Sequence, residues 1–450
     1  MNLFRKGALS LCALLSLSFA LPAQQANAEG FSTVLEGSAR AMSLAGGLVA
    51  RGGDASVIAY NPAAMTRLEG TQFQANLAIT QMYWGVDVEK KDGSNDNYHS
   101  AHQTWPIPSW YLSHQLNDKV WLGIGQFTRF GLGVKYPNGW DGGFNLQSVQ
   151  LITSSINPNI AYKLTDKISI AVGAEVLYAD MQMRKNMSVG VDPMLKGFPV
   201  APGLSAYDAF GSAGDMNLNG HGFAFGGNIA LHAQLNDQWA VGLTYRAPMS
   251  LKVNGKARWD NAIVPGLNFA GDPTKFGIGS LKNKVRGTIH LPDSFAMAVS
   301  YKPTKSLSFE AGAIYTLWSR FENFNIYMKD PINDWNNTDK KWKNNWTFNI
   351  SGEWWATDWM ALRLGFVYDM SPAHTGNSDY MMPSNGRNYY TAGVGFKWDK
   401  WTIDLAYMYA HNHELVYNEA AEENSGKGVL RGRTTHPHAH NFGIGIGYKF

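Results

Sequence analysis

The sequence predicts an all-β protein: a 14-stranded antiparallel transmembrane β-barrel with an N-terminal hatch segment that plugs the lumen. Large apolar residues alternate with small or polar ones, most clearly where Phe442, Ile444, Ile446 and Tyr448 are spaced two apart near the C-terminal Phe450. Successive side chains of a strand point to opposite faces, so such a strand has one apolar face. The chain also carries 16 Trp and 20 Tyr and repeats one kind of short turn. Aromatic girdles and tight turns along one rim are typical of membrane barrels.

The first 28 residues read as a secretory signal peptide. Arg5 and Lys6 precede an apolar run from Ala8 to Leu21, and Ala26-Asn27-Ala28 offers small residues for cleavage near Ala28. This apolar run is too short for a membrane helix. The single cysteine, Cys12, lies in this segment. The mature protein is therefore expected to contain no disulfide and no thiol chemistry.

Charge and hydropathy exclude several classes of protein. Without the signal, 36 basic residues face 35 acidic ones. This balance predicts neither nucleic acid nor an acidic macromolecule as a partner. Hydrophobic residues make up 45% of the chain, yet mean hydropathy is −0.24. Because no run of eighteen apolar residues follows the signal, a bundle of membrane helices is excluded.

Residues 29–70 do not follow the two-residue alternation. They are rich in Gly and Ala, with a helix-prone stretch from Ser38 to Leu44, and they precede the first strand. Fourteen strands enclose a lumen wider than their own side chains can fill. Residues 29–70 are therefore predicted to form a hatch in the lumen of a barrel built by residues 71–450.

Six short turns set the strand count. Each joins two alternating segments, as in a tight hairpin. They are Asn117-Asp118-Lys119, Thr165-Asp166-Lys167, Asn236-Asp237-Gln238, Pro303-Thr304-Lys305, Thr357-Asp358 and Asp399-Lys400. The segments between them are long enough for two strands and a long loop each. With two strands before the first turn and two after the last, fourteen strands result.

The charged residues of these strands fall on one face. In the segment from Ile168 to Tyr178 the even positions are apolar, whereas Glu175 has the opposite parity. The same parity in other strands carries Arg246, Glu310, Glu353, Arg363, Asp369 and Asp404. A charge facing lipid at mid-membrane costs about 2–4 kcal/mol, so these residues are expected to face the lumen. A soluble sandwich would also bury one face, but it requires neither long strands nor tight turns on one edge only.

Two expected extracellular loops are unusually apolar. Residues 185–219 include Phe198 and Leu204, and residues 254–281 include Phe269. Clustered apolar residues on paired loops indicate a groove that captures a lipid chain. Alternatively, these side chains pack against one another and stiffen the loops.

A second candidate binding element is the end of the segment that follows Ile168. Met181 and Met183 have inward parity, and Arg184 and Lys185 follow them. Unbranched Met adapts to a flexible alkyl chain, and a cation can neutralise a carboxylate. Arg320 is a further inward cation by parity. Alternatively, these cations pair with lumen acids.

Two further motifs concern the wall and the rim. Phe130-Gly131-Leu132 is predicted to kink the third strand, since Gly in a strand permits a bulge or a break, although a strand-end Gly would look the same. His436, His438 and His440, with His411 and His413 across the same loop, are spaced alternately. Without Cys or a carboxylate pair nearby, no metal site is predicted.

Several of these motifs together resemble one protein family. They are Glu29-Gly30-Phe31, Ser38-Ala39-Arg40-Ala41, Asn61-Pro62-Ala63-Ala64, Phe130-Gly131-Leu132, Ile156-Asn157-Pro158-Asn159-Ile160-Ala161-Tyr162, Leu291-Pro292-Asp293 and Trp318-Ser319-Arg320-Phe321. In this order they are similar to the FadL family, the long-chain fatty acid transporters of the Gram-negative outer membrane. The resemblance covers nearly the whole mature chain.

The resemblance implies a passive route for long-chain fatty acids across the bacterial outer membrane. Cargo is expected to enter at the extracellular loops, bind in the lumen and leave through a side opening at the kinked third strand. Phe31 would form the gate, and Asn61, Pro62 and Ala63 belong to the same gate and hatch element, where Asn61-Pro62 is expected to set a turn rather than to bind cargo. Lys185 falls where the family places a basic carboxylate ligand. Asn325 occupies a second such position, which weakens the case for a fatty acid headgroup.

The remaining expectations concern partners and alternatives. The protein is expected to need no cofactor, to be no enzyme, to be a monomer in lipopolysaccharide-containing membrane, and to present Phe450 to the barrel assembly machinery. Uptake of aromatic hydrocarbons by the same fold is the main alternative. A general porin is a weaker one, because the hatch opposes an open pore. A hydrolase would require a nucleophile motif, and none is visible in the sequence.

Overall fold

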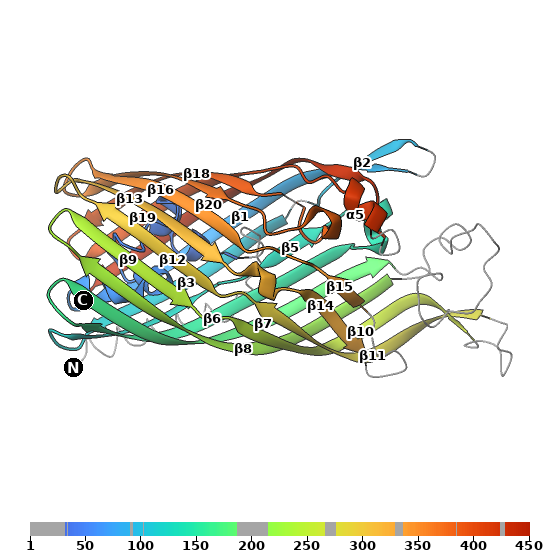
Figure 1. Cartoon of the computed structure of the whole chain (residues 1–450), viewed down its shortest axis with the longest axis horizontal. Helices are drawn as coiled ribbons and strands as arrows, with labels where there is room; N and C mark the ends of the chain where they lie inside the picture. The colour runs from blue at the N-terminus through green and yellow to red at the C-terminus, as the bar shows by residue number, and fades with distance from the viewer. Residues whose placement is uncertain are drawn as a thin grey trace.

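The computed structural model describes residues 32–33, 35–90, 93–101, 103–186, 215–265, 276–328, 336–383, 385–423 and 428–450. It is a closed barrel of antiparallel strands, drawn lengthwise in Figure 1. The predicted 14-stranded barrel is confirmed. Some strands are interrupted, so the fourteen strands are divided into 20 labelled segments.

The uninterrupted strands are β1 (Thr71–Glu89), β6 (Ser148–Lys163), β7 (Ile168–Asn186), β8 (Asp215–Gln234), β17 (Met360–Asp369), β18 (Arg387–Trp398), β19 (Trp401–Asn412) and β20 (Gly432–Lys449). The interrupted strands are β2 (Asn95–His99) with β3 (Gln103–Gln115), β4 (Val120–Phe127) with β5 (Leu132–Lys135), β9 (Trp239–Arg246) with β10 (Met249–Pro265), β11 (Phe276–Leu291) with β12 (Ser294–Tyr301), β13 (Leu307–Thr316) with β14 (Asn323–Met328), and β15 (Asn336–Asp339) with β16 (Asn345–Trp355). The barrel closes where β1 pairs with β20, from Gln72 opposite Lys449 upward.

The tight turns gather at one end of the barrel, at the left in Figure 1. Their shared chemistry has a local cause. The Asn117 side-chain oxygen accepts hydrogen bonds from the amides of Lys119 and Val120, and the Thr165 hydroxyl oxygen accepts them from Lys167 and Ile168. An Asn or Thr at the first turn position thereby replaces a backbone turn bond. In outer-membrane barrels such short turns lie on the periplasmic side.

The two faces of the wall divide as the alternation predicts. Leu364 is 67% exposed and Val172 is 52% exposed. Arg363 and Glu175, which have the opposite parity in the same two strands, are 4% and 1% exposed. Seven of the charged residues predicted to face the lumen are buried: Glu175, Arg246, Glu310, Glu353, Arg363, Asp369 and Asp404. The inward prediction for Arg320 is wrong, because η5 (Trp318–Arg320) interrupts the strand there and its side chain is exposed. The outer face is therefore apolar and the charges are enclosed.

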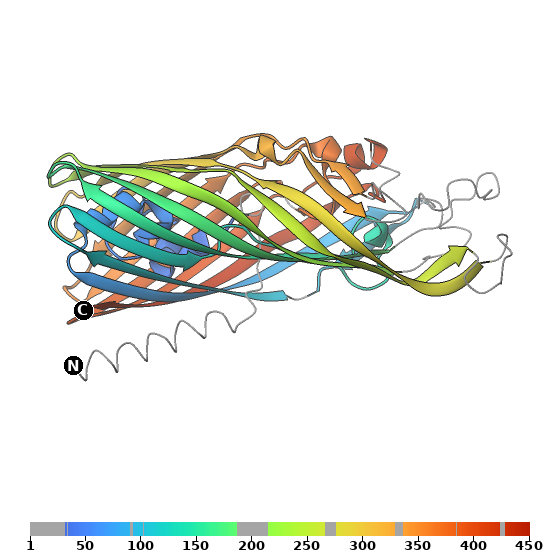
Figure 2. The ribbon, with the colours of Figure 1, turned by 90° about the horizontal axis from the view of Figure 1, so that it is seen from below.

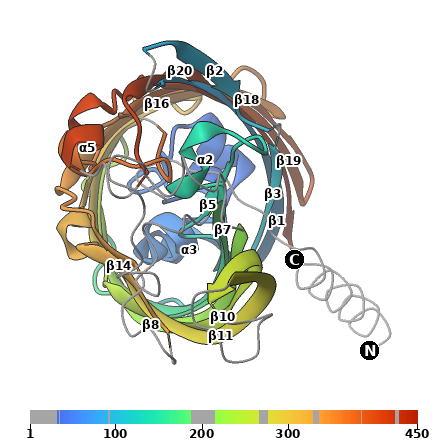
Figure 3. The ribbon, with the colours of Figure 1, turned by 90° about the vertical axis from the view of Figure 1, so that its right-hand side faces the viewer.

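Short helices occupy the lumen, as Figure 3 shows in a view down the barrel. They are η1 (Leu35–Gly37), α2 (Ala39–Ser43), α3 (Val57–Tyr60) and η2 (Pro62–Arg67). Ser38 caps α2 by accepting a hydrogen bond from the amide of Ala41. Asn61 caps η2, with Pro62 at its first position, where proline's fixed φ suits a helix start. We call residues 32–70 the hatch segment.

The other end of the barrel carries more irregular structure. It includes η3 (Asp141–Phe144), η6 (Thr375–Asn377) and α5 (Asn418–Glu423), while η5 (Trp318–Arg320) interrupts the wall between β13 and β14. No helix in the described part of the chain is long and apolar enough to cross a membrane. The expectation of a loop over residues 254–281 is wrong at both ends. β10 continues to Pro265 and β11 starts at Phe276, since the two-residue alternation of Val253, Gly255 and Ala257 persists and supports pairing (Figure 2).

Candidate transport pathway

The lumen on the loop side of the barrel is lined by apolar and aromatic side chains. Met181 and Met183 point inward from β7 and are 3% and 4% exposed. They belong to one buried cluster with Leu177, Met216, Leu218, Leu251, Val253 and Met408. Stacked aromatics belong to the same cluster: the ring centroids of Tyr136 and Trp140 are 4.0 Å apart. We call this region the apolar upper lumen.

The hatch segment is held to the wall by ion pairs in addition to apolar packing. Arg40 pairs with Glu353 at 3.0 Å, and Glu353 also accepts a bond from Arg363 at 2.7 Å. Arg363 reaches Asp404 at 2.5 Å. These side chains are nearly buried, so the pairs are well shielded from water. We call this set the hatch network.

Glu310 adds a second attachment of a different kind. Its carboxylate accepts three successive backbone amides of the hatch segment: Val49 at 3.0 Å, Ala50 at 3.2 Å and Arg51 at 2.5 Å. Hydrogen bonds to an ionised acceptor are about twice as strong as neutral ones. The barrel wall therefore grips the hatch backbone directly.

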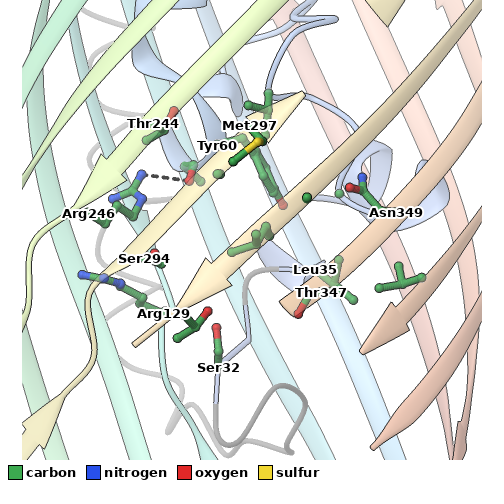
Figure 4. Close-up of a pocket in the computed structure, with 18 of the residues that line it drawn as sticks. Ser32, Leu35, Tyr60, Arg129, Thr244, Arg246, Ser294, Met297, Thr347 and Asn349 are labelled. Carbon is green, nitrogen blue, oxygen red and sulfur yellow. Dashed lines mark hydrogen bonds between the residues drawn. The ribbon is translucent and has the colours of Figure 1, made fainter. Parts of the chain in front are cut away.

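A small cavity of about 50 Å³ lies between the upper lumen and the hatch network. Leu35 and Tyr60 of the hatch segment line one side, and Phe130, Met297 and Val367 of the wall contribute apolar surface (Figure 4). Arg129 and Arg246 lie together at its edge. The cavity is thus apolar with a cationic corner.

That corner is a buried cluster of two arginines and one acid. Glu175 lies 3.4 Å from both Arg129 and Arg246 and accepts a bond from Ser155 at 2.8 Å. Arg246 also donates to the carbonyls of Ile58 and Ala59 in the hatch segment. These three groups alone carry one positive charge in excess, and the nearby acid Asp293, which also attracts Arg129, pairs with Arg320. Sequence reasoning missed Arg129, although a cation directly before Phe130-Gly131 was visible.

The third strand is interrupted beside this cavity. β4 ends at Phe127 and β5 begins at Leu132, so Phe130 and Gly131 lie in the interruption. β3 pairs with β4 only from Trp110 to Gln115. Residues 103–109 of β3 pair with β1 but have no strand partner on the other side within the described chain. Higher up, the amide of Ala101 bonds the carbonyl of Lys135 at 3.1 Å and joins the two strands again.

Two prolines occupy the unpaired edge of β3. Strand amides point alternately to the two neighbours. The amide of Gln115 bonds Gly70 on the β1 side, so even-numbered residues of β3 face the third strand. Pro106 and Pro108 are even-numbered and have no N–H to offer. The edge of β3 that faces the third strand therefore lacks two backbone N–H donors in the region where pairing between these strands stops.

The carbonyls that those donors would have met have other partners. Extending the register that pairs Trp110 with Gln126 puts Pro108 opposite Thr128 and Pro106 opposite Phe130. The carbonyl of Thr128 instead accepts from the Thr33 hydroxyl at 3.1 Å, and that of Phe130 from the Thr153 hydroxyl at 2.5 Å. The Thr33 amide also bonds the carbonyl of Arg129. The hatch segment therefore supplies hydrogen-bond donors to two backbone carbonyls of the interrupted strand.

The predicted cationic ligands lie apart from the cavity, and two of them pair with acids. Arg184 pairs with Asp215 at 3.0 Å at the top of β7 and β8, and Lys185 is half-buried next to it. Arg320 pairs with Asp293 at 2.5 Å. Their role in binding cargo stays a prediction. Phe31, Phe198, Leu204 and Phe269 lie outside the described residues.

The Asn-Pro-Ala motif lies deep in the hatch segment. Asn61 is fully buried and donates to the carbonyls of Val49 and Leu231 at 2.7 and 3.0 Å. Its side-chain oxygen accepts the amide of Ala63 at 3.1 Å. Pro62 and Ala63 follow in η2. The motif ties a hatch turn to β8, and its assignment to a gate stays a prediction.

One hatch carboxyl group has a shifted pKa. Burial raises the pKa of Glu36 to about 7, against the smaller opposing effects of its backbone hydrogen bond and the Arg387 guanidinium. One of its carboxyl oxygens is buried without a hydrogen-bond partner among the described residues. The hatch thus contains a carboxyl group that titrates near neutral pH.

The histidines near the C-terminus lie on the outer face of β20. His438 stacks on Tyr83 with ring centroids 5.2 Å apart, and His440 bonds the Tyr407 hydroxyl at 2.8 Å. No group of three potential metal ligands is found within the described ranges. These histidines extend the aromatic surface above the apolar belt.

Comparison with known proteins gives the family. The family described as "Outer membrane protein transport protein (OMPP1/FadL/TodX)" matches residues 19–450. A putative outer membrane protein of Neisseria meningitidis serogroup B is 26% identical, with 97% of each chain covered. A long-chain fatty acid transport protein of Shigella flexneri is 22% identical over 84% of this chain and 87% of its own.

Solved structures agree on the fold. A FadL homologue of Pseudomonas aeruginosa superposes with a TM-score of 0.77 at 18% identity, over 95% of this chain and 100% of the other. The toluene transporter TodX of P. putida gives a TM-score of 0.68 at 15% identity, over 94% and 99%. With its apolar outer face and hatch-filled lumen, the chain belongs to the OMPP1/FadL/TodX family of bacterial outer-membrane proteins that transport hydrophobic compounds.

Proposed function

We propose that the protein carries long-chain fatty acids passively across the outer membrane and releases them sideways through its wall. Cargo enters the apolar upper lumen, reaches the cavity at Phe130, and leaves between β3 and the interrupted third strand. No energy source is needed, because each step transfers an alkyl chain between apolar surroundings. Lys185, Arg184 and the loop residues of the sequence prediction belong to the capture step.

The observation that carries this proposal is the unpaired, proline-lined edge of β3. An exposed strand edge in hydrocarbon is costly because its N–H groups find no partner. Pro106 and Pro108 remove two of those groups, so an opening there is tolerated. The edge lies at the depth of the apolar belt, since Pro106 and Pro108 are opposite Ile79 and Leu77 of β1.

The small size of the cavity supports gating by the hatch segment. About 50 Å³ is far below the roughly 300–1,000 Å³ of typical ligand pockets. Leu35, Tyr60 or Phe130 must therefore move before an alkyl chain can bind. Thr33, which bonds Thr128 and Arg129, links such a movement to the interrupted strand.

The cationic corner favours a carboxylated cargo. Arg129 and Arg246 share a single directly paired acid, Glu175, so a fatty acid carboxylate would find an additional cation there. The relatives named long-chain fatty acid transport proteins support the same assignment.

Aromatic hydrocarbons are the second candidate. Phe130, Trp318, Phe321 and Trp342 form a cluster of edge-to-face and tilted ring contacts beside the interruption, and aromatic rings bind one another in this way. TodX is a toluene transporter. Competition between labelled oleate and toluene for the purified protein separates the candidates: displacement of oleate by unlabelled oleate but not by toluene supports the first.

The lateral route is tested by restoring the missing donors. The variant P106V/P108V keeps apolar side chains toward lipid but adds two amides that can pair with Thr128 and Phe130. Uptake of labelled oleate by proteoliposomes should fall to a small fraction of the wild-type rate, and amides 106 and 108 should resist hydrogen exchange. The matched control is P158V, a lipid-facing proline of β6 opposite Ile124 in a paired region, which should transport normally. Unchanged uptake with protected amides in P106V/P108V would exclude this exit.

Two expectations on partners remain proposals. Phe450 is 57% exposed beside Tyr448 at the turn end of the barrel, where a C-terminal aromatic is accessible to the assembly machinery. We also propose that the transporter acts as a monomer, because all described parts of the pathway lie within one barrel.

A further inference from the structure

The outer face of the β10–β11 hairpin carries a dense group of basic side chains. Lys252 and Lys256 of β10, and Lys282, Lys284 and Arg286 of β11, all point outward and are exposed. We call these five residues the basic patch. Figure 1 places the two strands on the barrel wall toward the loop end. Inward neighbours such as Val253, Ala257 and Val285 are buried, so this part of the hairpin belongs to the wall.

The charges of the basic patch oppose one another within the protein. Lys256 lies directly opposite Lys284 in the ladder, and Lys282 lies opposite Arg258. Like charges at directly opposed positions of a sheet destabilise it. None of the five patch residues forms an ion pair with an acid in the described chain. An anion that is not part of the protein would relieve this repulsion by binding between the basic side chains.

The basic patch begins where the aromatic girdle ends. Lys252 lies opposite Phe223, whose ring contacts Tyr178 at 5.2 Å. One step further round the barrel, Tyr245 and Phe295 are 4.6 Å apart. Aromatic girdles mark the boundary between hydrocarbon and headgroups. The patch thus lies at headgroup depth on the side of the membrane away from the short turns.

We propose that the basic patch is a binding site for the phosphates of the glycolipid in the outer leaflet, lipopolysaccharide. The glycolipid's acyl chains would lie against Phe223, Phe295 and their neighbours, while its phosphates neutralise Lys252, Lys256, Lys284 and Arg286. Arg and Lys clusters bind phosphate by charge-assisted hydrogen bonds. A soluble phosphate has no acyl chain that could contact the adjoining apolar surface.

The test measures glycolipid binding by the full-length purified protein. The variant K252Q/K256Q/K284Q/R286Q removes four charges and is compared with K167Q/K302Q/K305Q/K397Q, which removes four exposed lysines from the turn end. Bisphosphorylated lipid A should bind wild type and control alike. Each lost patch charge should weaken binding about fivefold, giving a loss of several hundredfold for the patch variant.

Three probes distinguish the sources of phosphate. Bisphosphorylated lipid A should raise the unfolding temperature of wild type, whereas dephosphorylated lipid A and inorganic phosphate should each have little effect. If inorganic phosphate gives the same shift as lipid A, the site accepts any anion and the proposal fails. Equal lipid A binding by the patch variant and the wild type would also overturn it.

A milder variant guards against misfolding of the quadruple one. In lipid-free detergent, K256Q removes the repulsion with Lys284 and should leave the unfolding temperature unchanged or higher. In lipid A it should lose part of the stabilisation seen in wild type. A decrease of the same size in both media would show that Lys256 has only a structural role and would refute the site.

Discussion

The two halves of the lumen both contain apolar packing, and they differ in how much charge adds to it. Around the hatch segment, Arg40, Glu353 and Arg363 form directional ion pairs that fix one arrangement. In the apolar upper lumen, Met181 and Met183 pack without direction, and Met adapts to different neighbours at little cost. A transporter needs both: a rigid half that blocks water and a compliant half that yields to cargo.

The interrupted third strand lies where these halves meet. Phe130 belongs to the apolar cluster, while the preceding Arg129 belongs to the buried charged group. Thr33 bonds the same stretch from the hatch side. Movement of the hatch segment is thereby coupled to the wall where we propose that cargo leaves.

The largest expected effect comes from breaking the hatch network. Glu353→Gln removes the carboxylate shared by Arg40 and Arg363, which keep only Asp54 and Asp404 as acidic partners among the described residues. The loss of three buried charge-assisted bonds should cost about 3–5 kcal/mol. The hatch segment should then undock, seen as faster hydrogen exchange over residues 35–67 and a steady ion conductance in planar bilayers. Glu69→Gln, at an exposed pair with Lys449, is the control and should behave as wild type. A closed, protected hatch in Glu353→Gln would show that charge does not hold it.

The second prediction concerns pH and Glu36. Its folded-state pKa of about 7 lies above its ordinary value of 4.5, so docking is favoured below pH 4.5 and weakens as pH rises through about 7. The loss amounts to something on the order of 3 kcal/mol. Limited proteolysis of the hatch segment should accelerate from pH 5 to pH 8. Arg387 faces this carboxyl group and limits the effect. Glu36→Gln cannot ionise, so a pH dependence that persists in this variant would assign the effect to another group.

A third prediction targets the apolar upper lumen. Met181→Glu places a charge among apolar side chains and should slow oleate uptake at least about tenfold, since an alkyl chain would have to pass a buried polar group. Met181→Leu conserves volume and should transport normally. Equal uptake by both variants would place the pathway elsewhere.

The smallest effect is expected at the junction between the two halves. Thr33→Val removes the hydroxyl that bonds the Thr128 carbonyl but keeps the side-chain shape, at a cost of about 1 kcal/mol. Hydrogen exchange near residues 127–132 should rise about fivefold, while the hatch network stays protected. Thr33→Ser restores a hydroxyl and serves as the control. Faster exchange over the whole hatch segment would mean that the two halves are not separable.

Much of the architecture was predictable because the signals are local. The turn chemistry of Asn117 and Thr165 acts within three residues, and the alternation from Ile168 to Tyr178 acts within one strand. These signals gave the strand count, the lipid-facing surface and the position of the hatch segment. The expected loop at 254–281 was misjudged because polar residues on the outer face of a strand above the membrane look like loop residues.

The candidate site was less predictable because its contacts are long-range. Met181 and Met183 were expected in the lumen from parity, which is a property of one strand. Arg129 and the edge formed by Pro106 and Pro108 were missed, because their roles in the site depend on which strand lies beside them.

By itself, the sequence determined that this protein is a barrel with an apolar outer face. The two-residue alternation that shows this can be read within each strand, without knowing which strands are neighbours. Only the tertiary structure decided which charges meet: Arg40 and Glu353 are separated by 313 residues along the chain. It also decided that β3 stops pairing beside the cavity. The energetic cost of a missing backbone N–H depends on the carbonyl of the neighbouring strand that would have accepted its hydrogen bond.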